Sequence, residues 1–522
     1  MLCKTHMHRG NGIKEWMIVV LAWLLSSTVA FAQQAKPNIV IFLVDDMGPM
    51  DTSVPMLADE NGKPQRHPLN DWYRTPNMER LAAQGVRFSN FYSHTVCSPT
   101  RISIMTGQNS ARHHTTDWIN PYQNNRDMNN KQFPREITRR VPPKWNWEGL
   151  GKEDVTLPAI LKQAGYTTIH IGKAHFGPDR HEGADPRNLG FDVNVGGSAI
   201  GHPQSYYGRM DYGKGSRQAV PHLEKYHGTE TFLTEALTQE ARAEVSKALD
   251  TGKPFFLYMS HYAVHAPFNS DPRFADHYKD RDKGKAAQAY ATLIEGMDKS
   301  LGDLMDHLEA KGVAQDTLIF FLGDNGGDAP LKGTDDISSS APLRGRKGSK
   351  WEGGVRVPFI AAWAKPAPNN KWQKELPIVA GSIRQEIGAC YDLLPTIADL
   401  VDAPIPTGHP VDGQALTRLL TERSDPERRN EFLSHYPHPR RGESHFFTTW
   451  RNGNWKVRYE YSTDDNRYAL YALDSDPAES RNLAPANPEK LKSMMRAMLL
   501  ELESMRALYP VRNGLQLRPA IP

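Results

Sequence analysis

The chain has 522 residues, 39% of them hydrophobic and 24% charged, which is ordinary for a globular protein and long enough for a large domain with a smaller partner. No repeat of about 20 to 50 residues is visible, which excludes a solenoid. The formal net charge is only +3, and this balance excludes a protein built for general nucleic-acid binding.

Residues 1–32 have the layout of a secretory signal peptide. Basic residues open the segment, residues 16–25 (WMIVVLAWLL) form an apolar run, and Ala30 and Ala32 place small side chains before Gln33. The apolar run is short for a membrane span. We therefore expect cleavage after Ala32 and a periplasmic or secreted protein without stable membrane insertion. The alternative is an uncleaved membrane anchor.

Two of the three cysteines, Cys97 and Cys390, remain after removal of residues 1–32. Three basic residues and one acidic residue leave with that segment, so the formal charge of the remainder is +1. An exported protein can pair two cysteines, but two do not make a disulfide framework. Cys390 lies in an apolar stretch (GACYDLL), which predicts a buried small hydrophobic residue. Cys97 needs another explanation.

Four short apolar runs each end in polar residues that are capable of chemistry. The runs cover 38–44, 167–171, 255–259 and 317–322. They are rich in β-branched and aromatic residues and do not alternate with polar ones, which is typical of strands buried on both faces of a parallel sheet.

Helical patterns lie between these runs. Residues 285–311 carry an apolar stripe of period 3.6, and Gly312 is a suitable C-cap. Residues 157–161 form a shorter pattern that stops before Gly165. Alternating strands and helices predict an α/β fold with a large, mostly parallel sheet flanked by helices. Ligands of such sheets bind beyond the carboxyl ends of the strands, so the polar clusters are expected to share one site.

The pattern changes near residue 430. Residues 446–450, 454–459 and 468–473 are typical of short strands joined by turns, and 491–505 of an amphipathic helix. We therefore divide the chain into a signal peptide (1–32), a catalytic α/β domain (33–429) and a C-terminal α+β subdomain (430–522) with antiparallel strands and a helix.

Two of the strand ends carry oxygen ligands. Asp45 and Asp46 follow the first run, and Asp324 and Asn325 follow the last one. Adjacent carboxylates repel each other, and four oxygen donors suit a hard cation such as Ca²⁺ or Mg²⁺. The alternative is two unrelated loops in which Asp and Asn serve as turn residues.

Cys97 opens the segment CSPTRISIMTG, by residue type just ahead of a short helical turn. A helix N-terminus favours bound anions, and Arg101 adds a fixed positive fork. The alternative is a buried cysteine beside a structural arginine.

This segment resembles the signature of the type I, formylglycine-dependent sulfatases of the alkaline-phosphatase superfamily, whose core is Cys-x-Pro-x-Arg. Further blocks are similar to that family and occur in family order over most of the chain. These are PNIVIFLVDDMG (37–48), AGYTTIHIGKAHFG (164–177), PFFLYMSHYAVHAPF (254–268), GDNGG (323–327), PLRGRKGSKWEGGVRVP (342–358), DLLPTIADL (392–400), VDGQAL (411–416) and LYALDSDPAESRNL (470–483).

The resemblance implies an alkaline-phosphatase-like fold and a specific nucleophile. In this family a separate maturation enzyme oxidises the cysteine to formylglycine (3-oxoalanine), whose hydrated form, a gem-diol, attacks sulfur. Cys97 is the matching residue. The family's cation is usually Ca²⁺, with Mg²⁺ as the alternative, and its ligands match Asp45, Asp46, Asp324 and Asn325 together with modified Cys97.

The remaining roles are implied by the same resemblance. Arg101 matches the residue that stabilises the formylglycine hydrate, and Lys173 and Lys347 match residues that contact sulfate oxygens. His175 matches the base that takes a proton as sulfate leaves, and His265 the donor to the leaving alcohol, helped by Lys347. Without the resemblance, a histidine after a strand is usually structural, and Lys347 lies in a basic run typical of a solvated face.

The expected substrate is an extracellular sulfated mono- or oligosaccharide. Residues 113–125, 197–207 and 435–441 mix aromatic and polar side chains and are candidates for the substrate pocket. The stretch 435–438 (HYPH) resembles relatives that act on sulfated galactose or N-acetylgalactosamine. Two alternatives remain: a phosphonate monoester or phosphodiester hydrolase of the same superfamily, and a non-catalytic protein that binds sulfated sugars.

Overall fold

The computed structural model describes residues 1–2, 36–122, 135–330, 337–422, 424–440, 445–461 and 467–522. The chain divides into two units, residues 1–36 and 37–522. The signal peptide predicted at 1–32 therefore lies almost wholly outside the described residues. Within the described ranges, no helix combines the length and apolar character needed to cross a membrane.

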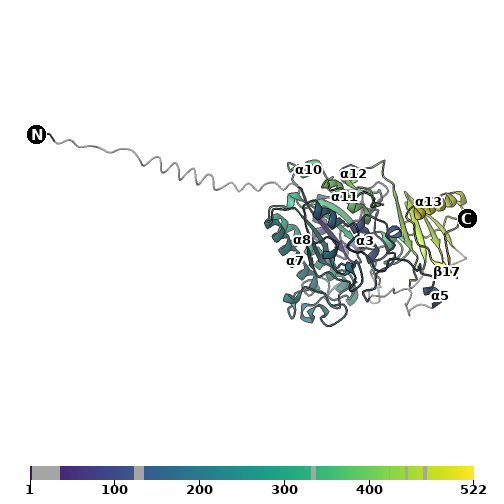
Figure 1. Ribbon diagram of the computed structural model, residues 1–522, viewed down its shortest axis with the longest axis horizontal. Helices are drawn as coiled ribbons and strands as arrows, with labels where there is room; N and C mark the ends of the chain where they lie inside the picture. Colours follow the sequence, from purple (N-terminus) through teal and green to yellow (C-terminus); the bar gives the residue numbers. More distant parts are fainter. Residues whose placement is uncertain (3–35, 123–134, 331–336, 423, 441–444, 462–466) are drawn as a thin grey trace. The chain divides into compact units, whose positions relative to one another are not determined.

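An eight-stranded sheet forms the centre of the larger unit (Figure 1). Only β10 runs antiparallel to its neighbours, which confirms the predicted mostly parallel α/β sheet. The four runs predicted as strands correspond to β1, β6, β8 and β9. In spatial order the strands are β11 (Ser382–Arg384), β4 (Val86–Phe88), β10 (Phe359–Trp363), β9 (Thr317–Gly323), β1 (Asn38–Val44), β8 (Phe255–Ser260), β6 (Thr167–Gly172) and β7 (Val193–Val195).

Each central strand is apolar on both sides because helices cover both faces of the sheet. Val40 and Phe42 of β1 belong to one core cluster, and Ile41 and Leu43 belong to another. Successive side chains of a strand point to opposite faces, so a strand between two cores needs an uninterrupted apolar run. This explains why the sequence shows no alternation there.

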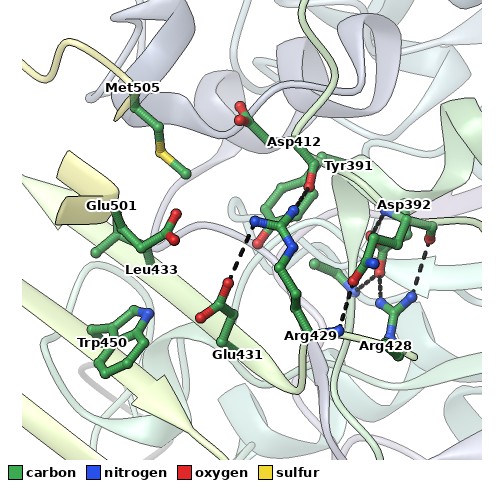
Figure 2. A pocket seen from close by; sticks show the side chains of 12 residues that line it. Tyr391, Asp392, Asp412, Arg428, Arg429, Glu431, Leu433, Trp450, Glu501 and Met505 are labelled. Carbon is green, nitrogen blue, oxygen red and sulfur yellow. Dashed lines mark hydrogen bonds and ion pairs between the residues drawn. The ribbon is translucent and has the colours of Figure 1, made fainter. Parts of the chain in front are cut away.

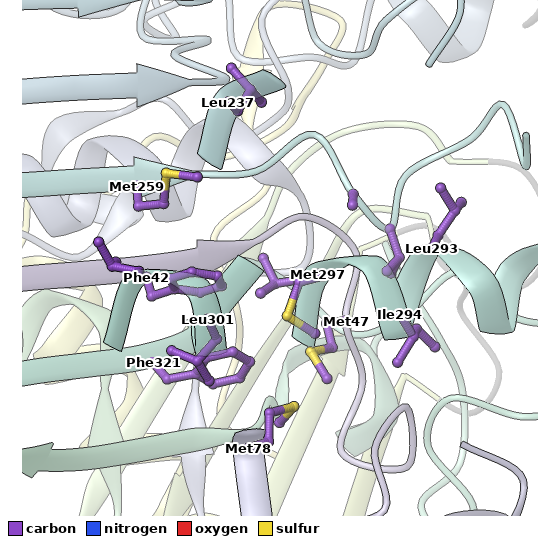
Figure 3. Packing of buried hydrophobic residues seen from close by; sticks show 14 of the residues in the cluster. Phe42, Met47, Met78, Leu237, Met259, Leu293, Ile294, Met297, Leu301 and Phe321 are labelled. Atoms are coloured by element: carbon purple, nitrogen blue, oxygen red, sulfur yellow. The ribbon is translucent and has the colours of Figure 1, made fainter. Parts of the chain in front are cut away.

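Two sets of helices provide these cores. The first cluster contains side chains of α2 (Pro76–Gln84), α7 (Leu233–Asp250) and α8 (Lys285–Ala310), and the second those of α3 (Cys97–Thr106), α6 (Leu157–Gln163) and α11 (Leu393–Leu400). Figure 3 shows Met297 and Leu301 of α8 against Phe42 and Phe321 of the sheet. The predicted helix at 285–311 is confirmed, and Gly312 follows it with a φ of 73°.

A separate antiparallel sheet follows, in the order β13 (Glu431–Tyr436), β14 (Phe447–Asn452), β15 (Trp455–Glu460) and β16 (Tyr468–Ala472). Helix α13 (Pro488–Ser504) shares a core with it. β13 is absent from the prediction, because Pro437 and the histidines beside it are typical of a loop. The strand nevertheless pairs along its whole length with β14, and its side chains after Glu431 are buried, among them Phe432 and Leu433 in the hydrophobic clusters.

Shorter elements connect these layers. They are β2 (Leu57–Ala58), β3 (Pro64–Gln65), β5 (Phe91–Tyr92), β12 (Gly388–Ala389), β17 (Val511–Arg512), β18 (Leu515–Gln516), α4 (Ser110–His113), α5 (Arg135–Thr138), α9 (Glu352–Val355), α10 (Lys371–Glu375), α12 (Thr417–Thr421) and the 3-10 helices η1 (Pro68–Asp71), η2 (Glu182–Ala184), η3 (Pro186–Leu189), η4 (Gly208–Gly213), η5 (Glu224–Tyr226), η6 (Ala275–His277), η7 (Ala314–Asp316) and η8 (Cys390–Asp392).

His170, in the middle of β6, is expected to make the fold sensitive to acid. It is fully buried, and its ring stacks on Tyr258 with 5.6 Å between centroids. Burial, helped by the charge of Arg101, lowers the pKa of His170 to about 3. The unfolded chain binds a proton near pH 6.5 and the folded chain does not. Stability is therefore present above pH 6.5 and is lost as pH falls toward 3.

Because of this single group, the free energy of unfolding is expected to be about 2 kcal/mol lower at pH 5 than at pH 7. His170→Phe should reduce the pH dependence of denaturant-induced unfolding between pH 7 and 5 by that amount. The same measurement at pH 7.5 reports any loss from packing alone. An unchanged pH slope in the variant would contradict the assignment.

Candidate active site

The strand ends bring the predicted residues to one edge of the central sheet. Asp45 and Asp46 follow β1, Asp324 and Asn325 follow β9, and Lys173 follows β6. Parallel strands place their carboxyl ends together, which is why segments far apart in the sequence meet here. Direct contacts or a shared cavity connect all ten candidate residues, which also include Cys97, Arg101, His175, His265 and Lys347.

Cys97 is the first residue of α3, a helix of ten residues, and does not precede a short turn as predicted. Val96 before it is extended, and Gly107 ends the helix with a φ of 68°. Cys97 is a free thiol and only 4% exposed. Burial raises the pKa of Cys97, so the thiol stays protonated at neutral pH and is a poor nucleophile as it stands. Cys390 is also free and fully buried, which confirms its predicted packing role.

The oxygen-rich cluster has the features of a cation site. Single ligand atoms of Asp45, Asp46 and Cys97 all lie within 4.8 Å of one another. Asp45 Oδ1 and Asn325 Oδ1 are buried and have no hydrogen-bond partner. Burial and the nearby Asp324 raise the pKa of Asp45 well above its ordinary value. Unpartnered buried oxygens and repelling carboxylates fit a hard divalent cation, which would satisfy both.

Arg101 holds the residues of this cluster together through hydrogen bonds to three of the strand ends. Its side chain is fully buried, and Nε and Nη2 donate to Asp324 Oδ2 at 3.0 and 2.8 Å. Nη1 donates to the carbonyl oxygen of Lys173 and to Ser260 Oγ, at 2.9 and 2.7 Å. Burial opposes the charge, but Asp324 and Asp45 more than compensate and raise the pKa of Arg101. Ser260 belongs to the polar residues that end the run 255–259 and were expected at the shared site, but no motif assigned it a role.

Two lysines place positive charge beside the carboxylates. Lys173 Nζ lies 2.7 Å from Asp45 Oδ2, and Lys347 Nζ lies 2.7 Å from Asp46 Oδ1. Burial opposes ionisation of Asp46, but Lys347 and His265 hold the pKa of Asp46 below its ordinary value. Lys347, whose pKa is raised by Asp46 against the effect of burial, stays charged. Lys347 thus faces the site and not solvent.

The two histidines are held as neutral rings with one free nitrogen each. His175 Nε2 lies 2.7 Å from the carbonyl oxygen of Ile119, so this nitrogen carries the proton and Nδ1, which has no partner, is left as an acceptor. His265 Nδ1 lies 2.8 Å from the carbonyl oxygen of Ala266, and its Nε2 is 3.6 Å from Asp46 Oδ2. Burial lowers the pKa of both histidines, helped by Lys173 at His175 and by Lys347 at His265. His261 instead contacts Ser300 inside the core, as expected for a structural residue.

A cavity of about 450 Å³ opens above Cys97. Each stretch proposed for the substrate pocket contributes to its lining, through Trp118, His202 and Arg440 among others. The residues absent from the prediction are Gln218 and Asp328, because neither belongs to a motif. His435 and His438, in contrast, are buried against Thr448 and Thr116 and do not line the cavity.

A smaller cavity, separate from the one above Cys97, is lined by Asp392, Arg428, Arg429 and Glu431 of β13, among others (Figure 2). Its volume is about 20 Å³, room for about one water molecule. Arg428 forms an ion pair with Asp392, and Arg429 lies 3.5 Å from Glu431. This cavity contains none of the candidate catalytic residues and is too small for an organic substrate.

Comparisons with known proteins agree with the motifs. The sulfatase family model matches residues 37–403. The N-acetylgalactosamine-6-sulfatase of Mus musculus is 31% identical over 420 residues, which cover 76% of this chain and 68% of the relative. A sulfatase of Formosa agariphila is 26% identical over 566 residues, and the match covers 94% of this chain and 94% of the relative.

Among solved structures, that of Ps i-CgsB in complex with k-i-k-neocarrahexaose has a TM-score of 0.68 at 24% sequence identity, covering 90% of this chain and 93% of that one. This likeness supports the alkaline-phosphatase-like fold. The match to the family model extends over well more than half of the chain, and it confirms the resemblance inferred from Cys-x-Pro-x-Arg and the accompanying blocks. The chain belongs to the sulfatase family and is a sulfuric ester hydrolase.

Proposed function

We propose that this sulfatase is exported and removes sulfate from an extracellular sulfated carbohydrate, with Cys97 converted to formylglycine by a maturation enzyme and with a bound divalent cation. The observation that carries the proposal is the position of Cys97. It begins α3 at the base of the cavity, within 4.8 Å of the Asp45 and Asp46 ligand atoms, and it shares that cavity with Lys347. Export with cleavage after Ala32 and a division into domains 33–429 and 430–522 belong to the same proposal.

The protonated state of Cys97 supports the modification. Burial raises the pKa of this thiol, although Lys173 and Lys347 oppose the effect. A protonated thiol attacks sulfur poorly, whereas the hydrate of formylglycine supplies an oxygen nucleophile and a second hydroxyl that can expel sulfate. Arg101 is proposed to stabilise this hydrate, and through its bonds to Asp324 it also keeps one cation ligand in place.

Asp45, Asp46, Asp324 and Asn325 are the proposed ligands of the cation, together with modified Cys97. The cation is proposed to be Ca²⁺, with Mg²⁺ as the alternative, because the donors are carboxylate and amide oxygens. Its charge would stabilise an ionised nucleophile and a sulfate oxygen. Lys173 and Lys347 are proposed to hold the remaining sulfate oxygens, since both are positive and already lie at the carboxylates of the cluster.

The histidines are proposed to move protons at opposite ends of the reaction. His175 Nδ1 is the free acceptor and takes the proton of the second hydroxyl as sulfate departs. His265 lines the cavity and is proposed to donate to the oxygen of the leaving alcohol in its protonated form, since the neutral ring carries its hydrogen on Nδ1. Burial and Lys347 lower the pKa of His265, so Lys347, which stays charged, is proposed to help by donating to the same oxygen.

The cavity above Cys97 suits a sugar ring. Trp118 and Tyr122 offer aromatic faces, and Asp328, Arg440 and Gln218 offer hydrogen-bonding groups at its wall. The similarity to N-acetylgalactosamine-6-sulfatases, together with the HYPH stretch, favours sulfated galactose or N-acetylgalactosamine. Arg440, three residues after Pro437, is the part of that region that reaches the cavity.

A panel of position-defined sulfated monosaccharides tests the proposal, with the corresponding phosphate esters as matched controls. We expect sulfate release from 6-sulfated galactose or N-acetylgalactosamine, and at least about tenfold slower cleavage of the phosphates. Activity only on glucosamine, fucose or aryl sulfates would exclude the galactose assignment. Faster cleavage of phosphates would favour the phosphonate or phosphodiester hydrolase, and tight sugar binding without hydrolysis in formylglycine-containing protein would favour a binding protein.

A further inference from the structure

A second cavity, of about 630 Å³, adjoins the cavity above Cys97. Pro121 and Tyr122 line both of them, so the two spaces meet at these residues. Apart from Tyr122, the function proposed above uses no residue of the second cavity. Its size is sufficient for another sugar ring, which raises the question of what its walls would recognise.

Two consecutive residues connect the cavities. Gln218 lines the first cavity, and its Nε2 donates to the hydroxyl of Tyr122 at 2.8 Å. Gln218 Oε1 is buried and has no partner, so an acceptor remains free for a ligand hydroxyl. Arg217 lines the second cavity, with its guanidinium carbon 5.0 Å from the centre of the Tyr122 ring. One short segment and one aromatic ring therefore contribute to both spaces.

Arg217 is the cation of this second cavity that is free to bind a ligand. Within the part of the chain that the structure describes, no carboxylate lies within ion-pair distance of it, and its side chain is exposed. Arg187, by contrast, is neutralised by Asp185 at 2.7 Å. Arg180 lies 3.7 Å from Asp179, which also lines the cavity, so an anion that reached Arg180 would meet that carboxylate as well. An anionic group entering the cavity would meet Arg217 without displacing a partner.

We propose that the second cavity binds the neighbouring sugar of a sulfated oligosaccharide, and that this sugar carries an anionic group, a carboxylate or a sulfate, that pairs with Arg217. The inference rests on the proposed function, since it places the reacting sulfated sugar above Cys97. The ring of Tyr122 would lie between the two sugars, with Gln218 on one side and Arg217 on the other. The enzyme would then select oligosaccharides with a charged second sugar over monosaccharides.

Binding to the full chain with unconverted Cys97, in the presence of Ca²⁺, tests this inference without depending on turnover. Three probes are compared by calorimetry: N-acetylgalactosamine 6-sulfate, its disaccharide with a uronic acid, and the same disaccharide with the uronic acid reduced to a neutral hexose. We expect the charged disaccharide to bind about fivefold more tightly than the neutral one, because an exposed ion pair contributes an affinity gain of this order. Arg217→Ala should abolish that difference, and Arg217→Lys should retain part of it.

Arg209→Ala is the matched control, because Arg209 also stacks on a tyrosine, 4.2 Å from the Tyr207 ring, but lies outside both cavities. It should leave all three affinities unchanged. Equal or undetectable binding of the two disaccharides, or the same result for Arg217→Ala and Arg209→Ala, would overturn the inference. Loss of sulfate release from the monosaccharide by formylglycine-containing protein would instead refute the proposed function while leaving the binding result intact.

Discussion

Cys97→Ala is expected to lower kcat for sulfate ester hydrolysis by about 10⁴-fold or more, the order of loss seen when a covalent nucleophile is removed. The reason is that alanine at position 97 cannot be oxidised to formylglycine, so the proposed oxygen nucleophile is lost. Stability should change little beyond the loss of a small buried side chain, since Cys97 is a free thiol and not part of a disulfide. Turnover of the best sulfated sugar and a thermal melt of the same preparation measure the two effects.

Cys390→Ala is the matched control, because Cys390 is the other free, buried cysteine in the described part of the chain and lies in η8, outside the cavity. It should retain activity. Mass spectrometry of the tryptic peptide 88–101, from protein produced with a maturation enzyme, should show sulfur and two hydrogens replaced by one oxygen. Full activity in protein whose Cys97 remains a thiol would refute the formylglycine assignment.

Removal of the divalent cation is expected to lower activity on the order of 10³-fold, because a metal that stabilises a developing oxyanion contributes several kcal/mol to the transition state. The melting temperature should fall as well. Without a cation, Asp45 faces Asp324 in a buried site, and Oδ1 of Asp45 and Oδ1 of Asn325 lack hydrogen-bond partners. Re-adding Ca²⁺ at about 100 times its Kd should restore about 2.7 kcal/mol, or about 3 °C for a chain of this size.

The measurement is activity and melting temperature after chelation, and again during titration with Ca²⁺ or Mg²⁺. Asn325→Ala removes one oxygen donor and should raise the Ca²⁺ concentration needed for half-maximal activity by about tenfold or more. Asn188→Ala, at an asparagine of η3 outside the site, should not. Undiminished activity in protein shown by elemental analysis to contain no divalent metal would exclude the cation role.

The sheet could be predicted from the sequence because its signals are local. A run such as 317–322 is apolar throughout, and the polar residues that follow it mark where the strand ends. Parallel topology then places Asp45 and Asp324 at the same edge. These steps depend only on patterns within a few residues and on one general rule of α/β sheets. The role proposed for Cys97, in contrast, rests on the resemblance of Cys-x-Pro-x-Arg to the family signature, because local patterns left a structural cysteine as an alternative.

The partners within the site were decided by tertiary contacts, because side chains hundreds of residues apart meet there. Lys347 pairs with Asp46 across 301 positions, which no basic run in the sequence reveals. Gln218 and Asp328 reach the cavity from positions outside any motif. Burial then sets the chemistry. The raised pKa of the Cys97 thiol and the unpartnered oxygen of Asn325 arise only when the folded chain excludes water from both.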